Sequence, residues 1–114
     1  IIACGVKSLP LEHIVRTSTG ALYDMPFAIE NNIYDVLNDL KMAGFTSYGA
    51  DMSGQDIRET RIDKKKVLVL GSEGEGLSSR VVSKLDCAVS IKMKHEFDSL
   101  NVSVAAAILM DRMR

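Results

Sequence analysis

The sequence lacks the features that mark secreted, membrane-spanning or disulfide-stapled proteins. Among its 114 residues it has no tryptophan and only two prolines and two cysteines. Cys4 and Cys87 lie among apolar residues and share no metal-ligand spacing, so we interpret both as buried thiols in a reducing compartment, the cytoplasm. No apolar run approaches the roughly 18 residues that span a membrane. No basic segment precedes the first apolar residues, as it would in a signal peptide.

An excess of charge of either sign is also absent. Fourteen basic and fifteen acidic residues leave a net charge of -1. This balance creates no broad positive field, so we expect the chain alone to attract nucleic acid only weakly. A polyanionic substrate would require a local basic patch or a further domain. The chain begins at Ile1 without a methionine, with the pattern of a strand's end, so we expect it to be the latter part of a longer protein.

What is present is an alternation of short β-rich runs and helical patterns, which fits one domain over residues 1–114. The predicted strands are 1–6, 25–30, 45–50, 66–71 and 87–93, and the predicted helices are 10–22, 31–44, 76–85 and 98–114. The stretch 51–65 predicts a polar loop with at most a short helical turn. This order predicts an α/β fold, a mostly parallel sheet with helices on both faces.

Two details of these elements are specific enough to check. Asn31 should cap the helix 31–44 and Gly44 should end it, and Asp98 or Ser99 should cap the closing helix. The strand at 25–30 is expected to be buried.

A glycine-rich turn, LGSEGEGLSS at 70–79, lies between a predicted strand and a predicted helix. Glycines permit positive φ and a close approach of the backbone to a ligand, and the following helix offers unpaired N–H groups. Its spacing fits neither a P-loop nor the dinucleotide fingerprint. Glu73 and Glu75 would each repel a nearby phosphate by about 1 kcal/mol or more, whereas carboxylates suit a ribose hydroxyl or a cation. The simpler alternative is a tight connection whose glutamates complement the helix N-terminus.

A second polar segment, SLN at 99–101, follows the strand SIKM at 90–93 and leads into the closing helix. Ser99 and Asn101 are common capping residues, which is their simplest interpretation. The helix that follows is small and apolar all round, so it should pack closely on more than one side.

Together these two segments resemble the SpoU (TrmH-like) family of the SPOUT superfamily, S-adenosylmethionine-dependent RNA ribose 2′-O-methyltransferases. LVLGSEGEGLS resembles the family's second motif, and SIKM followed by SLNVSVAAAIL resembles the third. VRTSTGAL is similar to a family helix that precedes NNIYDVLNDLKMAGF. The resemblance covers nearly the whole chain in order. It implies ribosomal or transfer RNA as substrate, a C-terminal trefoil knot, a homodimer formed through the closing helix, and no metal.

The resemblance also implies site residues. The implied cofactor-binding residues, mostly through their backbones, are Gly71, Ile91 and Leu100, with Met93, Gly76, Thr17 and Ser18 as secondary contacts. The implied residues around the methyl-transfer site are Glu73, Ser99 and Asn101. An acidic turn agrees with a nucleoside that carries a sulfonium cation. His13 and His95 are isolated, and we expect neither to act as a ligand or base.

The chain also departs from the family pattern. The first motif, whose arginine is usually assigned to activating the ribose oxygen, would precede Ile1, so this chain by itself could hold the cofactor without being active. Lys92 and His95 stand where a proline and a glycine are usual, which would reshape the loop or place positive charge near the RNA. The basic run at 64–66 is better explained as a solvated approach to a strand than as a phosphate grip.

Two alternatives remain open at this point. One is a non-catalytic module of the same fold that binds S-adenosylmethionine or RNA. The other is an unrelated flavodoxin-like or regulatory α/β domain, in which the glycine turn is only structural.

Overall fold

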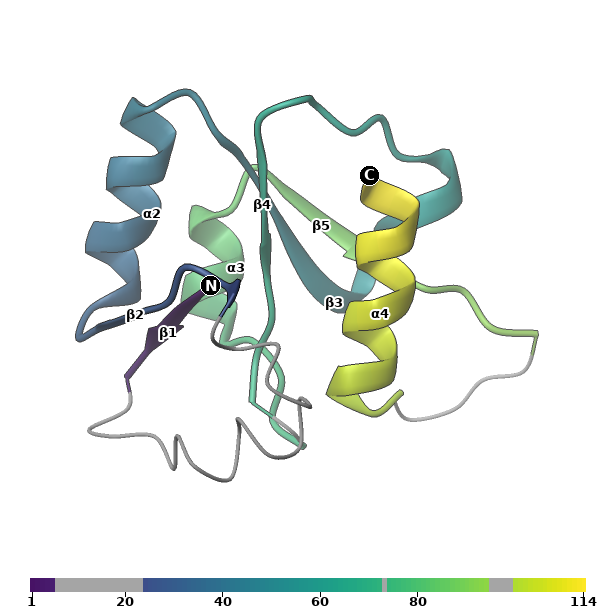
Figure 1. Ribbon diagram of the computed structural model, residues 1–114. Helices are drawn as coiled ribbons and strands as arrows, with labels where there is room; N and C mark the ends of the chain where they lie inside the picture. Colours follow the sequence, from purple (N-terminus) through teal and green to yellow (C-terminus); the bar gives the residue numbers. More distant parts are fainter. Residues whose placement is uncertain (6–23, 73, 95–99) are drawn as a thin grey trace. The chain divides into compact units, whose positions relative to one another are not determined.

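The computed structural model describes residues 1–5, 24–72, 74–94 and 100–114 (Figure 1). The chain divides into two compact units, residues 1–36 and 37–114. None of the helices in the described ranges has both the length and the apolar character that crossing a bilayer requires. Several sequence predictions lie outside the described residues: the helix 10–22 with His13, Thr17 and Ser18, and the side chains of Glu73, His95, Asp98 and Ser99.

The first unit contains a two-stranded parallel sheet of β1 (Ile2–Cys4) and β2 (Ala28–Glu30). At one end of this sheet the Ala28 N–H donates to the Ile1 carbonyl, and at the other end the Gly5 N–H donates to the Glu30 carbonyl. Both strands lie within the predicted runs. The prediction that the second is buried is wrong, because all three of its residues are exposed.

The helix α2 (Ile33–Met42) forms where its apolar periodicity predicts it. Its cap is Asn32 rather than the expected Asn31: the Asn32 Oδ1 accepts from the Tyr34 N–H at 2.9 Å. Gly44 ends the helix as predicted, with a φ of +91°. The Gly44 N–H donates to the Lys41 carbonyl, and the Phe45 N–H donates to the Leu40 carbonyl. This pair of hydrogen bonds defines a Schellman motif.

The second unit is built on a parallel sheet in the order β4-β3-β5, comprising β3 (Thr46–Asp56), β4 (Lys66–Val69) and β5 (Cys87–Ser90). The crossover from β4 to β5 contains α3 (Ser79–Lys84) and passes over the central strand β3. Register places Gly49 of β3 level with Val69 on one side and Ala88 on the other. Both strand pairings of this sheet are parallel, as the alternating pattern predicts.

The central strand extends beyond the predicted strand 45–50. β3 continues through Asp56, six residues into the predicted polar loop, after a bulge between Ala50 and Gln55. A 3₁₀ turn, η2 (Ile57–Glu59), follows it and matches the short helical turn that the sequence allowed. The buried Ser90 hydroxyl donates to the Gly54 carbonyl at 2.8 Å and holds this extension against β5.

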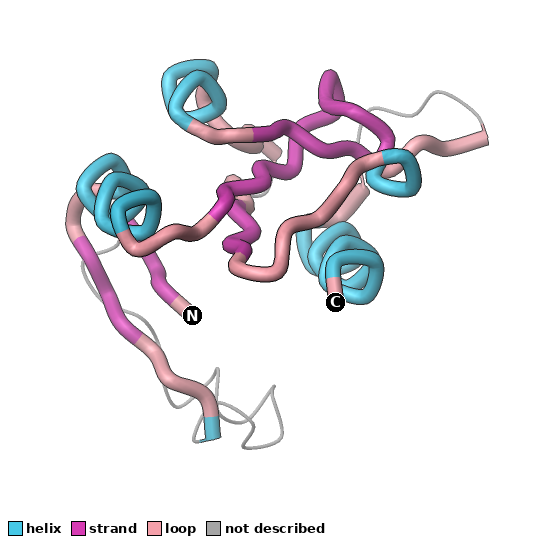
Figure 2. Tube along the Cα trace, turned by 90° about the horizontal axis from the view of Figure 1, so that it is seen from above, coloured by secondary structure: helices cyan, strands magenta, loops and turns pink. Residues whose placement is uncertain are grey.

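Helices cover both faces of the three-stranded sheet. α4 (Val102–Met113) and α3 lie on opposite sides of the strand layer (Figure 2). On the α4 side, a core cluster is formed by Tyr48, Ile57, Val89, Leu109 and Met113. On the α3 side, Gly49 leaves room for a leucine, because a Cβ there would lie 2.1 Å from the Leu85 Cδ1. The predicted two-sided α/β layering is therefore confirmed within this unit.

The cap of the closing helix differs from the prediction. α4 begins at Val102, and Asn101 caps it by accepting from the Ser103 N–H at 2.8 Å. Neither Asp98 nor Ser99 takes that position, because the helix begins later than the sequence pattern indicated.

Candidate functional site

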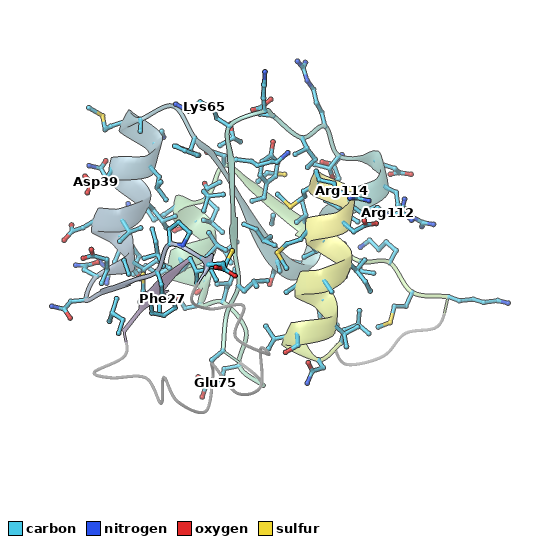
Figure 3. The ribbon with its side chains drawn as sticks, viewed as in Figure 1. Phe27, Asp39, Lys65, Glu75, Arg112 and Arg114 are labelled. Carbon is cyan, nitrogen blue, oxygen red and sulfur yellow. The ribbon has the colours of Figure 1, made fainter. Side chains whose placement is uncertain are left out.

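Both motif segments follow the carboxyl ends of parallel strands. The glycine-rich turn follows Val69 at the end of β4, and the segment 91–94 follows Ser90 at the end of β5. Because β4 and β5 flank β3 in parallel, these two segments lie along the same edge of the sheet, where α/β proteins bind their ligands. In Figure 3, Glu75 marks this carboxyl edge, while Lys65 and Arg114 lie at the opposite end of the unit.

The glycine-rich turn folds back on itself. The Gly76 N–H donates to the Ser72 carbonyl at 2.9 Å, and the same two residues form an isolated antiparallel bridge. Gly74 and Gly76 have φ values of +88° and +68°, which favour glycine. Gly71 is required by packing, because a Cβ there would lie 2.1 Å from the Gly76 carbonyl carbon. Each of the three glycines in the turn is needed for its backbone conformation or its packing, so the turn has a structural role.

The described part of the turn also has the character of a ligand cradle. A Cβ on Gly74 or Gly76 would meet no atom within 4 Å, so this stretch of backbone borders open space. Glu75 is exposed, and the described residues of the turn (70–72 and 74–78) include no basic side chain. This combination suits a hydroxyl-bearing or cationic ligand and disfavours a phosphate.

The helix after the turn is shorter than the sequence predicted. α3 begins at Ser79, three residues later than predicted, and has only six residues. Ser78 caps it, because its Oγ accepts from the Val81 N–H at 3.2 Å. The ligand-facing groups on this side are therefore those of the turn itself.

The segment after β5 alternates inward and outward. Ile91 packs against the core cluster and Met93 is half-buried, whereas Lys92 and Lys94 are exposed. Leu100, at the other end of this connection, is half-buried beside the start of α4. Ile91 and Met93 on this segment and Gly71 and Gly76 on the turn thus lie at one edge, on either side of β3; their contacts with a cofactor stay a prediction.

A bulge in the central strand β3, between Ala50 and Gln55, was missed by the sequence analysis. Ala50 pairs with Val89, so Asp51, Met52 and Ser53 leave the strand ladder between the two motif segments. The Asp51 carboxylate accepts from both the backbone N–H and the hydroxyl of Ser53, which fixes its orientation. The polar letters of this stretch predicted an ordinary loop. The signal that could have placed it is the predicted strand 45–50 immediately before, since Gly49 pairs with Val69, the last residue of β4.

The basic run at 64–66 lies at the amino end of β4, away from this edge. The Lys65 Nζ donates to the Ala43 carbonyl at 2.5 Å and lies 4.9 Å from the centroid of the Phe45 ring. Lys65 therefore caps the end of α2, which agrees with a role in the fold rather than with a phosphate grip.

Neither cysteine is part of a disulfide. Both are free and half-buried, and burial, together with the charge of Glu30 on the neighbouring strand, raises the pKa of the Cys4 thiol. A raised pKa disfavours the thiolate, so Cys4 is not poised as a nucleophile. Across the described ranges, no group of three or more His, Cys, Asp or Glu side chains is placed to hold a metal ion.

Comparison with known proteins identifies the family. The model of the SpoU rRNA Methylase family matches residues 1–111. An uncharacterized tRNA/rRNA methyltransferase of Borreliella burgdorferi is 39% identical over 98 residues, which cover 85% of this chain and 43% of that protein.

Solved structures share the fold. The AdoMet-bound rRNA methyltransferase of Sinorhizobium meliloti has a TM-score of 0.89 at 26% identity, over 100% of this chain and 44% of that one. A structure described as an RNA 2′-O ribose methyltransferase has a TM-score of 0.84 at 25% identity, over 98% of this chain and 43% of that one. The chain spans less than half the length of these relatives. The interpretation as an unrelated α/β domain is therefore wrong, and the chain belongs to the SpoU rRNA methylase family.

Proposed function

We propose that this chain forms the cofactor-binding part of an enzyme that methylates a ribose 2′-hydroxyl of ribosomal or transfer RNA, with S-adenosylmethionine as methyl donor. The observation that carries the proposal is the meeting of an acidic, open glycine turn and the third-motif segment at one carboxyl edge of the sheet. The AdoMet-bound relative and the RNA 2′-O ribose methyltransferase of the same fold support it.

The residues at this edge fit the donor's chemistry. S-adenosylmethionine, when bound, supplies an electrophilic methyl group on a sulfonium, and its adenosine offers ribose hydroxyls. We assign its contacts to the backbones of Gly71, Ile91 and Leu100, with Met93 and Gly76 beside them. The open backbone at Gly74 and Gly76 allows close approach, and the Glu75 carboxylate favours a cation over a phosphate.

The residues proposed around the methyl-transfer site are Glu73, Ser99 and Asn101. Of these, the Asn101 side chain is anchored by the Ser103 N–H at the start of α4. An anchored polar group at a helix start can hold a ribose in line with the methyl donor, and alignment of this kind accounts for much of the rate of a displacement. Removal of the 2′-hydroxyl proton needs a base, and we assign that step to none of these three residues.

The proposal extends to the assembly. We place residues 1–114 in one SpoU-type domain of a longer cytoplasmic protein, with the trefoil knot of its family and a homodimer interface on α4. α4 buries Leu109 and Met113 but leaves Val104 48% and Met110 57% exposed. We take these exposed apolar side chains as the candidate contacts with a partner chain.

The test is a methylation assay on the whole protein. We would incubate it with S-adenosylmethionine labelled on the methyl group and with ribosomal or transfer RNA, and then hydrolyse the RNA with alkali. Alkaline cleavage uses the 2′-oxygen as nucleophile, so a 2′-O-methylated ribose protects the next phosphodiester and the label appears in alkali-resistant dinucleotides. Label in mononucleotides would refute the ribose as target. Calorimetric binding of S-adenosylmethionine without any transfer would favour the alternative, a non-catalytic module of the same fold.

A further inference from the structure

Two cations lie at the third-motif segment and take no part in the proposed cofactor contacts. Arg58 comes from η2 and Lys92 from the segment after β5, and both act on the carboxylate of Asp56. The Arg58 Nη2 lies 3.0 Å from the Asp56 Oδ2, and its Nε lies 3.4 Å from the Oδ1. Arg58 is thus paired with Asp56, and the charge of Lys92 acts on the same carboxylate.

The strand register brings them together. Asp56, the last residue of β3, pairs with Ser90, the last residue of β5, and Lys92 follows two residues later. Asp56 also caps η2, because its Oδ1 accepts from the Arg58 N–H at 3.0 Å. The guanidinium is therefore fixed to the end of the sheet by a capping carboxylate, next to the segment that carries Ile91.

The charges are arranged so that the cations face outward. The Asp56 side chain is 12% exposed, whereas that of Arg58 is 60% exposed. The pKa of Asp56 is lowered, first by the hydrogen bonds from Arg58 and further by the charge of Lys92. Glu59 also acts on Arg58, and the exposed Lys94 continues the outward side of the segment beyond Lys92. Two carboxylates and three cations are therefore grouped here, and Lys94 leaves a small local excess of positive charge on the outward side.

We propose that Arg58 and Lys92 bind the phosphate backbone of the RNA strand whose ribose enters the site between the glycine turn and the third motif. This inference rests on the proposed function and adds a substrate-positioning surface to it. A guanidinium has five donors, so Arg58 can hold Asp56 and still donate to a phosphate. Lys92 adds a flexible point charge on the same side. Because the chain has no broad positive field, a local pair of this kind sets where the backbone lies.

The experiment measures RNA binding by fluorescence anisotropy, with the whole protein and a labelled single-stranded RNA of about 20 nucleotides, over a range of salt concentrations. The variants are R58A and K92A, singly and together, with K84A as the matched control, since Lys84 is an exposed cation on α3, on the other face of the sheet. R58K separates loss of charge from loss of the Asp56 contact. Thermal unfolding confirms that each variant is folded.

Each phosphate contact to single-stranded nucleic acid contributes about 0.7 to the slope of log affinity against log salt. We therefore expect each single variant to lower that slope by about 0.7 and the affinity roughly fourfold near 0.15 M salt, with the double variant losing both contributions. R58K should retain most of the affinity, and K84A should change neither quantity.

Equal losses in K84A would assign the effect to overall charge and overturn the proposal, as would an unchanged salt slope in the double variant. A parallel titration with poly-L-glutamate tests whether the pair merely attracts any polyanion, and an equal loss with that probe would also overturn it. Calorimetric titration of S-adenosylmethionine keeps this test separate from that of the proposed function. The donor should bind R58A and K92A as it binds the parent protein, whereas failure of the parent to bind it would refute the function and not the phosphate contact.

Discussion

Gly71→Ala is the substitution that tests most sharply whether the shape of the glycine turn makes the cofactor site. Gly71 lies at the start of the turn, directly beneath the residues that close it. A Cβ at this position would lie 2.1 Å from the Gly76 carbon, 2.3 Å from the Gly76 oxygen and 2.4 Å from the Leu77 nitrogen. All three are backbone atoms, so no side-chain rotation can relieve the clash.

The size of the effect follows from these distances. Real Cβ atoms essentially never approach other heavy atoms within 3.0 Å, so the closing strand of the turn must move away by roughly 1 Å. That movement weakens the bond from the Gly76 N–H to the Ser72 carbonyl, which is now 2.9 Å. Overpacking of this kind costs about 1–3 kcal/mol of folding free energy. The displaced backbone is the proposed cofactor contact, so affinity for S-adenosylmethionine should fall at least about tenfold.

Gly44→Ala, at the end of α2, is the matched control outside the turn. Its φ of +91° is strained for alanine, which costs about 1–2 kcal/mol, and a Cβ there would lie in ordinary contact, 3.5 Å from the Lys65 Nζ. The two variants should lose similar stability, measured as the free energy of unfolding in urea. Only Gly71→Ala should lose cofactor affinity by calorimetric titration. If both bind S-adenosylmethionine as tightly as the parent protein does, the backbone of this turn is not the cofactor contact.

Three further substitutions test contacts that stabilise the second unit. Tyr48→Phe removes a buried hydroxyl that accepts from the Asp63 N–H at 2.8 Å and donates to the Arg61 carbonyl at 3.3 Å; urea unfolding should show a loss of about 1–2 kcal/mol, and an unchanged midpoint would contradict the role of that hydroxyl. Asn101→Ala removes the α4 cap and should cost about 1 kcal/mol, whereas Asn101→Asp should restore it; an equal loss in both would argue against capping. Asp56 has a lowered pKa in the folded state, so its charged form stabilises the fold above the unfolded pKa and this contribution disappears as the pH falls through the folded value. Stability of Asp56→Asn, followed by urea unfolding below about pH 4, should therefore depend less steeply on pH than that of the parent, and parallel curves would refute this linkage.

The order of the strands and helices could be predicted from the sequence because strands buried in a parallel sheet are short runs of apolar residues. β4 and β5 both begin where their runs begin, at Lys66 and Cys87. The pattern failed where polar residues take part in pairing. The extension of β3 through Asp56 contains alternating polar and small residues, and its pairing with β5 after a bulge depends on contacts between residues more than thirty positions apart. The amino-acid pattern of a short segment does not reveal pairing with residues so distant in the sequence.

The ends of helices were less predictable than their existence. Asn31 and Asn32 are equally good caps on chemistry alone, and only the backbone geometry selects Asn32. The same is true of α4, where Asn101 was weighed as a possible cap but an earlier position was predicted. The glycine at position 44 was predictable because the left-handed conformation that ends α2 excludes most other residues.

The candidate site was predictable in its segments and not in its geometry. The two motif segments carry recognisable letters, so Gly71 and Ile91 could be named from the sequence. Their placement at one edge depends on β3 lying between β4 and β5, which follows from the sheet order alone. For the same reason, neither the Asp51 turn nor the Arg58 and Asp56 pair could be assigned to this edge from the sequence.

The central claim is that the acidic glycine turn and the third-motif segment select a sulfonium nucleoside and exclude a polyphosphate. Calorimetric titration of the whole protein with S-adenosylmethionine and, separately, with ATP tests it most directly. We predict a saturable heat of binding, with one site per chain, for S-adenosylmethionine and no heat of binding for ATP. Binding of ATP together with no binding of S-adenosylmethionine would contradict it.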